Sequence, residues 1–169
     1  MCHHNTNIMI AVPADPCFFK LTTNQILWDK FFNAGQICIT VDYVLVQWDF
    51  QDKLVTAFKE TYIAIFFSLP RLAILISHPG HSSYNQFYPE GPTKSESFSQ
   101  IVSDYHWTCL KGLLDRTKGT IVVSGESNTS TKYIAPTIVK DVKTNDSLMS
   151  EYVLYTIYIL CTLLTNIYS

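Results

Sequence analysis

A change of hydrophobic period at Gly35 constrains the fold of this 169-residue chain more than any other feature. Over residues 20–34, apolar side chains recur at intervals of three and four, which predicts a helix with one buried face. Those side chains are Leu21, Ile26, Leu27, Phe31 and Ala34. Residues 37–47, ICITVDYVLVQ, are instead β-branched and aromatic and predict a buried strand. Gly35 stands between the two patterns and suits the turn that ends the helix.

The same alternation continues along the chain. Residues 50–66 predict a second amphipathic helix, with Phe50, Leu54, Val55, Phe58 and Tyr62 on one face. Residues 95–119 predict one or two helices that begin at a Ser/Glu cap and end at Gly119, and 120–125 predict a short strand. The segment 132–142 reads as extended, although Pro136 argues against a central position in a sheet. Strands alternating with helices predict the α/β class.

Charge and cysteine usage exclude several classes of protein. The net charge is −2 and no two Lys or Arg residues are adjacent, so a nucleic-acid partner is not expected. The five cysteines are scattered without C-x-x-C spacing, which favours a reducing compartment over a disulfide framework or a zinc ribbon. The N-terminal residues MCHHNTNIMIAV lack the pattern of a secretory signal. We therefore expect one domain with a cytoplasmic location.

Two segments depart from this pattern. Residues 67–86 follow an apolar run with a His/Pro/Gly/Ser loop and read as an insertion, of the kind that a retained intron would produce. Residues 152–169 form a divergent hydrophobic tail almost free of charge. As a helix of about 17 residues this tail would span ~25 Å of a ~30 Å hydrocarbon layer, which is marginal for an anchor. Membrane association through 152–168 is therefore kept as a hypothesis.

The segment ILWDKFFNAGQICITVDYVLV, residues 26–46, resembles the active-cysteine segment of the aldehyde dehydrogenases, in their class 3 or fatty aldehyde branch. Residues 87–142, from FYPEGP to KYIAPTIVKDV, resemble the stretch that follows it in that family. The resemblance covers 1–66 and 87–151 as a partial catalytic domain. It implies an incomplete, Rossmann-like three-layer α/β domain from which the cofactor domain is absent.

The resemblance implies a chemistry for Cys38. In the family motif N-x-G-Q-x-C the cysteine attacks an aldehyde, and the resulting thiohemiacetal passes hydride to NAD or NADP and leaves a thioester for hydrolysis. Cys38 would be that nucleophile, with Asn33, Gly35 and Gln36 as supporting motif residues. From local sequence alone, a packed and inert thiol between Ile37 and Ile39 is the commoner arrangement.

The resemblance also identifies what the 169 residues lack. The family's Glu-Leu-Gly-Gly motif, which supplies the general base, would precede residue 8, and MCHHNTN does not contain it. The asparagine of the oxyanion hole belongs to the same missing part. Tyr152 follows Glu151 where the family has a second glutamate that holds the nicotinamide ribose. We therefore expect no cofactor-binding residues and no turnover by this chain alone.

Two alternatives to catalysis remain open at this stage. The chain could be a non-catalytic fragment that contacts a membrane or a partner, including a second copy, through 152–168. His78 and His81 have a spacing seen in metal sites, but no third ligand is identifiable, and Cys2, His3 and His4 lie at a terminus. No metal site is therefore predicted. Cys109 is expected to fill space on a helix face.

Overall fold

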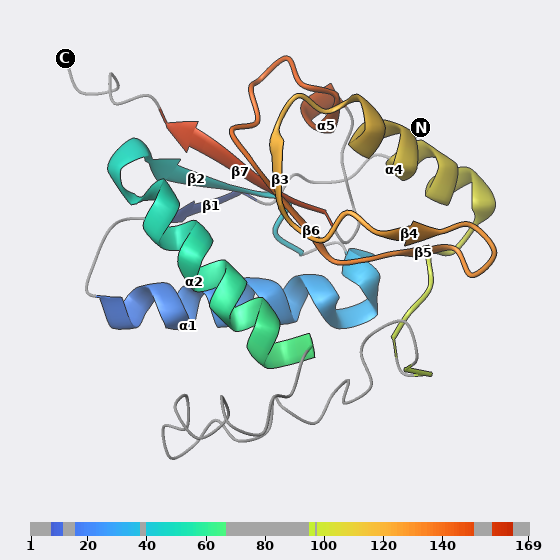
Figure 1. The fold of residues 1–169 in the computed structure, drawn as a ribbon, viewed down its shortest axis with the longest axis horizontal. Coiled ribbons are helices and arrows are strands. Elements are labelled where there is room, and N and C mark those ends of the chain that lie inside the picture. Colours follow the sequence, from blue (N-terminus) through green and yellow to red (C-terminus); the bar gives the residue numbers. More distant parts are fainter. Residues whose placement is uncertain are drawn as a thin grey trace.

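The computed structural model describes residues 8–11, 16–37, 40–66, 95, 96, 98–150 and 157–163, with helices on two sides of a central sheet (Figure 1). The sheet has five strands in the order β1-β2-β7-β6-β3. They are Ile8–Ala11 (β1), Tyr43–Gln47 (β2), Ile157–Leu163 (β7), Thr137–Lys140 (β6) and Thr120–Val123 (β3). Parallel pairing joins β1, β2, β7 and β6, and β3 adds to β6 antiparallel.

The described helices lie in two groups. Pro16–Phe31 (α1) and Trp48–Phe66 (α2) form one layer, while Asp104–Arg116 (α4) and Ser147–Ser150 (α5) lie on the other side of the sheet (Figure 1). Ser127–Asn128 (β4) and Tyr133–Ile134 (β5) form a separate two-stranded sheet. This arrangement is the predicted α/β class with three layers.

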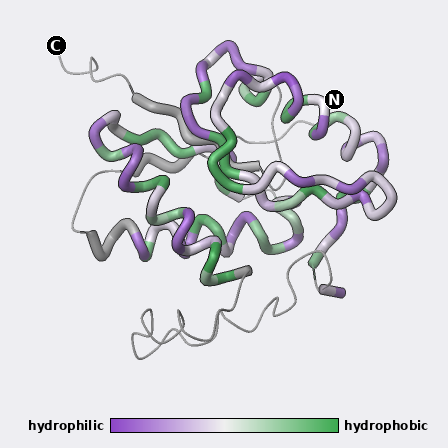
Figure 2. Tube along the Cα trace, in the orientation of Figure 1, coloured by the Kyte–Doolittle hydropathy of each residue, from purple (hydrophilic) through white to green (hydrophobic). Residues whose placement is uncertain are grey.

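Strand β2 distributes its side chains between the two faces of the sheet. Val44 and Val46 are buried in the core cluster that contains the α1 and α2 side chains, while Tyr43 and Leu45 pack against the cluster under α4. This alternation is the period of two that a strand imposes. Figure 2 shows the hydrophobic residues gathered at the centre of the molecule, between the helical layers. The strand predicted over 37–47 begins later, at Tyr43.

Helix α2 confirms the predicted amphipathic face almost residue for residue. It spans Trp48–Phe66 against the predicted 50–66. Leu54 and Phe58 are 0% exposed, and Val55 and Tyr62 are also buried. Phe50 is half-buried and packs against the edge of the same cluster. The apolar stripe alone was sufficient to orient this helix.

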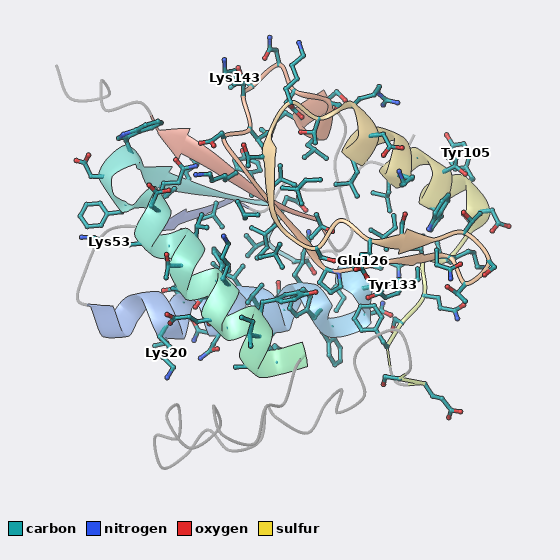
Figure 3. The ribbon with its side chains drawn as sticks, viewed as in Figure 1. Lys20, Lys53, Tyr105, Glu126, Tyr133 and Lys143 are labelled. Atoms are coloured by element: carbon teal, nitrogen blue, oxygen red, sulfur yellow. The ribbon has the colours of Figure 1, made fainter. Side chains whose placement is uncertain are left out.

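Helix α4 differs from its prediction at both ends. It spans Asp104–Arg116, and Ser103 is its N-cap, because the Ser103 side chain accepts a hydrogen bond from the His106 backbone N–H. The cap predicted at 95 and 96 is therefore wrong. The apolar residues Val102 and Tyr105 fit the helical spacing predicted for 95–119 but are 70% and 79% exposed. Tyr105 lies on α4 at the outside of the molecule (Figure 3). Shifting the start of the helix turns its buried face to Leu110, Leu113 and Leu114.

Gly119 was predicted to end this helix, but α4 already stops at Arg116. Instead the glycine lies against strand β6. A Cβ atom on Gly119 would come within 2.7 Å of the Val139 Cγ1 atom. The position thus allows the chain to approach the sheet closely.

The later part of the extended segment 132–142, strand β6, is central to the five-stranded sheet, contrary to the prediction drawn from Pro136. Strand β6 begins at Thr137 and pairs with both β3 and β7. Pro136 lies between β5 and β6, so its missing N–H is not needed by either ladder. The rule that proline avoids the interior of a sheet held for Pro136 itself but did not hold for the residues that follow it.

The hydrophobic tail contains a strand where a helix was considered. Ile157–Leu163 pairs with β2 on one side and β6 on the other, so it occupies the middle of the sheet. Across the described residues no helix is long and apolar enough to cross a membrane. Residues 67–94, which include the predicted insertion at 67–86 with His78 and His81, lie outside the described residues, as do Cys2, His3 and His4.

Candidate functional site

The motif predicted to carry chemistry begins where α1 ends. Phe32–Gly35 form a single 3₁₀ turn in which Asn33 and Ala34 have φ values of 57° and 52°. Gly35 follows at φ 71°. Three successive left-handed residues reverse the chain sharply, and two of them are not glycine, which is an uncommon and costly backbone arrangement. Cys38 itself lies outside the described residues.

Gln36 joins this turn to a segment far along the chain. Its side-chain Nε2 donates to the Asn33 carbonyl oxygen at 3.1 Å and to the Gln100 carbonyl oxygen at 3.1 Å. Its Oε1 accepts from the Val102 backbone N–H at 3.0 Å. Both ends of the amide are therefore used in a bridge across more than sixty residues of sequence. The structure thus brings Asn33, Gly35 and Gln36 together in one turn and holds that turn from outside.

The two ends of the motif loop, residues 31–41, are also joined to each other. The Asp29 Oδ2 accepts a hydrogen bond from the Val41 backbone N–H at 3.2 Å. Next to it, Lys30 Nζ lies 3.5 Å from Asp42 Oδ1, and both side chains are buried. Burial away from water lowers the pKa of Lys30 to about 8, although the Asp42 and Asp29 carboxylates oppose that shift.

Lys30 and Asp42 were not singled out from the sequence, yet a signal was present. Lys30 lies on the apolar stripe of its helix, four residues after Ile26 and three after Leu27. A lysine at such a position is seldom fully buried unless it has a partner of opposite charge. The partner, Asp42, is twelve residues away and comes beside it only through the fold.

Changing Gln36 to leucine is expected to release Val102 from the turn. The leucine keeps the volume but removes the acceptor of the Val102 N–H, so amide exchange at Val102 should accelerate by about two- to tenfold, as loss of a single hydrogen bond implies. NMR-detected hydrogen exchange measures this effect. Gln100→Leu is the matched control, since Gln100 takes part through its backbone carbonyl. Unchanged exchange at Val102 in Gln36→Leu would show that the bridge is dispensable.

The N-terminus of α2 does not suit the diphosphate group of NAD or NADP. Helix α2 follows β2 directly, with no glycine-rich loop between them, and Asp49 occupies its first turn. A carboxylate at that helix N-terminus disfavours the diphosphate that such an end otherwise attracts. Tyr152, which replaces the family's ribose-holding glutamate, lies outside the described residues. No group of His, Cys, Asp and Glu within the described part of the chain could hold a metal ion.

Cys109 was predicted to fill space on a helix face. It is half-buried on α4 and is not part of a disulfide. The buried face of this helix consists of leucines, so Cys109 lies at its border. This position agrees with the expected space-filling role more than with an exposed reactive thiol.

Comparison with known proteins places the chain among aldehyde dehydrogenases, although no protein-family model matches it. Mouse aldehyde dehydrogenase family 3 member B1 is 28% identical over 137 residues, which are 81% of this chain and 24% of that protein. Rat family 3 member A2 is 31% identical over 80% of this chain and 23% of its own length. A Neurospora crassa beta-apo-4'-carotenal oxygenase is 32% identical over 78% of the chain and 20% of its own length.

Solved structures agree on the fold. A substrate-bound Staphylococcus aureus AldH superposes with a TM-score of 0.72 at 23% identity, covering 96% of this chain and 30% of that one. An NADP-dependent glyceraldehyde-3-phosphate dehydrogenase from Bacillus halodurans has a TM-score of 0.68 at 18% identity, over 95% of this chain and 29% of that one. The chain spans about a quarter of the length of the curated relatives it matches.

Proposed function

Since this chain is a partial aldehyde dehydrogenase catalytic domain related in sequence to family 3, we propose that Cys38 is the nucleophile of an aldehyde-binding site. The motif residues around it, Asn33, Gly35 and Gln36, match the N-x-G-Q-x-C pattern of that family. In this proposal the substrate is an aldehyde, and Asn33, Gly35 and Gln36 hold the loop in one conformation.

The bridge made by Gln36 is the observation that carries this proposal. A thiol that merely fills a core needs no loop anchored at its middle and at both ends, whereas a nucleophile must be held within a fraction of an ångström of its working position. Here the middle is held by Gln36 on the Gln100–Val102 segment. The ends are held by the contacts of Asp29 with Val41 and of Lys30 with Asp42.

The proposed reaction is addition without a change of oxidation state. The Cys38 thiolate forms a bond to the carbonyl carbon, the π-electron pair of the carbonyl moves to oxygen, and that oxygen takes a proton from water. The product is a thiohemiacetal, which breaks down by the reverse path. The reactive form of cysteine is the thiolate, so the site must keep this thiol ionisable and reachable.

We propose further that the 169 residues alone stop at this adduct. Oxidation to a carboxylic acid needs a hydride acceptor, which in the family is NAD or NADP, and Asp49 in the first turn of α2 disfavours a diphosphate at that helix end. The Glu-Leu-Gly-Gly motif that supplies the family's general base does not occur in the sequence. In related acyl chemistry, loss of one oxyanion-hole donor alone lowers the rate by about 10²–10³. Formation of NADH that disappears in Cys38→Ala would overturn this part of the proposal.

Labelling with an aldehyde-like electrophile tests the nucleophile. The chain is treated with an eight-carbon vinyl ketone, with and without octanal, and the modified cysteine is identified by peptide mass spectrometry. We expect Cys38 to react about tenfold faster than the other cysteines, as a thiol pKa lowered by one unit implies, and octanal to slow this reaction.

Two variants serve as controls for the labelling. Cys38→Ala removes the fast phase, while Cys109→Ala, which changes a thiol outside the motif, leaves it intact. Even labelling of all five cysteines, or labelling that octanal does not slow, would contradict the assignment of Cys38.

A further inference from the structure

The Lys30–Asp42 pair is the feature of the described residues that packing explains least. Lys30 is 0% exposed and is among the largest fully buried side chains, in a helix stripe whose other buried members are the uncharged Thr23, Ile26, Leu27 and Phe31. Removing an ammonium and a carboxylate from water is costly, and their mutual attraction seldom repays that cost. A methionine at 30 facing a leucine at 42 would fill similar space without two buried charges.

The position of the pair along the chain is specific. Lys30 belongs to the last turn of α1, and Asp42 immediately precedes β2. The contact between Lys30 Nζ and Asp42 Oδ1 at 3.5 Å therefore closes the base of the loop that contains the cysteine motif. The hydrogen bond from the Val41 N–H to Asp29 runs beside it. Asp29 and Lys30, where the loop begins, thus contact Val41 and Asp42, where it ends.

The backbone on either side of the loop leaves the contact between Lys30 and Asp42 little freedom to shift. The loop must leave α1 through the left-handed residues Asn33, Ala34 and Gly35 and must enter β2 in a register that puts Val44 on the α1 side of the sheet. A shift of one residue at Asp42 would turn every β2 side chain to the other face. An ion pair in a low-dielectric interior tolerates such a shift poorly, because a displaced charge is left unpaired.

We propose that Lys30 and Asp42 act as a positioning pair, which sets the geometry of the motif loop and thereby the reactivity of Cys38. This inference rests on the proposed function, because it assigns the pair a role toward that nucleophile. In this role neither residue contacts the substrate. The Asp29 carboxylate, on the same helix as Lys30, also favours the charged form of Lys30 and accepts a hydrogen bond from the Val41 N–H.

The test removes both charges together. Lys30→Met/Asp42→Leu leaves no uncompensated buried charge, so its urea unfolding midpoint should equal or exceed that of the wild type. We nevertheless expect Cys38 labelling by the vinyl ketone to slow at least about tenfold. We also expect the pH midpoint of labelling by iodoacetamide to move toward the ordinary thiol value of about 8.5. Lys140→Met is the matched control, since it breaks an exposed pair with Asp52 and should change neither measurement.

A folded double variant that labels at the wild-type rate and pH midpoint would assign the pair to packing alone and overturn the inference. If the double variant does not fold, Lys30→Met/Asp42→Asn, which also removes both charges, takes its place with the same expected slowing. Failure of both to fold would make the pair a stability element and would also overturn the inference. Absence of preferential Cys38 labelling in the wild type would instead refute the proposed function itself.

Discussion

Replacing Phe58 by alanine is expected to lower the free energy of unfolding by about 3–5 kcal/mol, the range for a fully buried phenylalanine. Phe58 is 0% exposed in α2 and belongs to the core cluster that joins both helices of that layer to β2 and β6. Since small domains are stable by about 5–15 kcal/mol, this single change should remove about a fifth or more of the total. Urea unfolding followed by circular dichroism measures it.

Ile63 provides the control on the same helix. Its side chain is 39% exposed, so Ile63→Ala should cost about 1 kcal/mol or less. Equal losses from the two substitutions would mean that the α2 face described by the structure is not the buried one.

The second large effect is a rise in stability with pH that depends on Lys30. The pKa of this ammonium is about 8 in the folded chain, chiefly because burial disfavours its charge, against an ordinary value of 10.5. Between these values the unfolded chain binds more protons than the folded chain, so stability increases as pH rises. From pH 8 to pH 10 the free energy of unfolding should increase by about 2–3 kcal/mol. Below pH 8 the cost of burying the charged lysine is fully present.

Comparison with Lys30→Met/Asp42→Leu isolates this contribution. The double variant lacks the buried amine, so its stability should not show the Lys30-dependent rise over the same interval. The measurement ends at pH 10 because burial raises the pKa values of Tyr62 and Tyr133, and that stabilisation is lost as pH rises further. Parallel pH profiles for the two proteins would mean that Lys30 is solvated in the folded chain.

Local sequence was a reliable guide for α2 but less so for the first helix, where Leu21 was predicted on the buried face and is 45% exposed. The α2 stripe of Leu54, Phe58 and Tyr62 predicted both the helix and its orientation, because a period of 3.6 has a single buried side. Gly35 was predicted to end the first helix, but α1 ends at Phe31 and the left-handed backbone already begins at Asn33. The motif around Cys38 and the strand–helix alternation pointed to the same family that the comparisons found.

Contacts between distant residues lay beyond such reasoning. The sequence does not say that Ile157–Leu163 enters the sheet between β2 and β6, because strand order is a property of the whole chain. Pro136 misled for the same reason, since its effect depends on where the ladder begins, and Ser103 rather than Ser95 became the cap once α4 had packed.

The family, the α/β class and the place of the motif were therefore determined by the sequence itself, because they depend on period and on short motifs. Only the tertiary structure decided how the motif loop is held. Gln36 meets Val102 across 66 residues, and Lys30 meets Asp42 inside the core. Both contacts exist because burial makes a polar group seek whichever partner the fold brings near, and that partner is not encoded by neighbours in sequence.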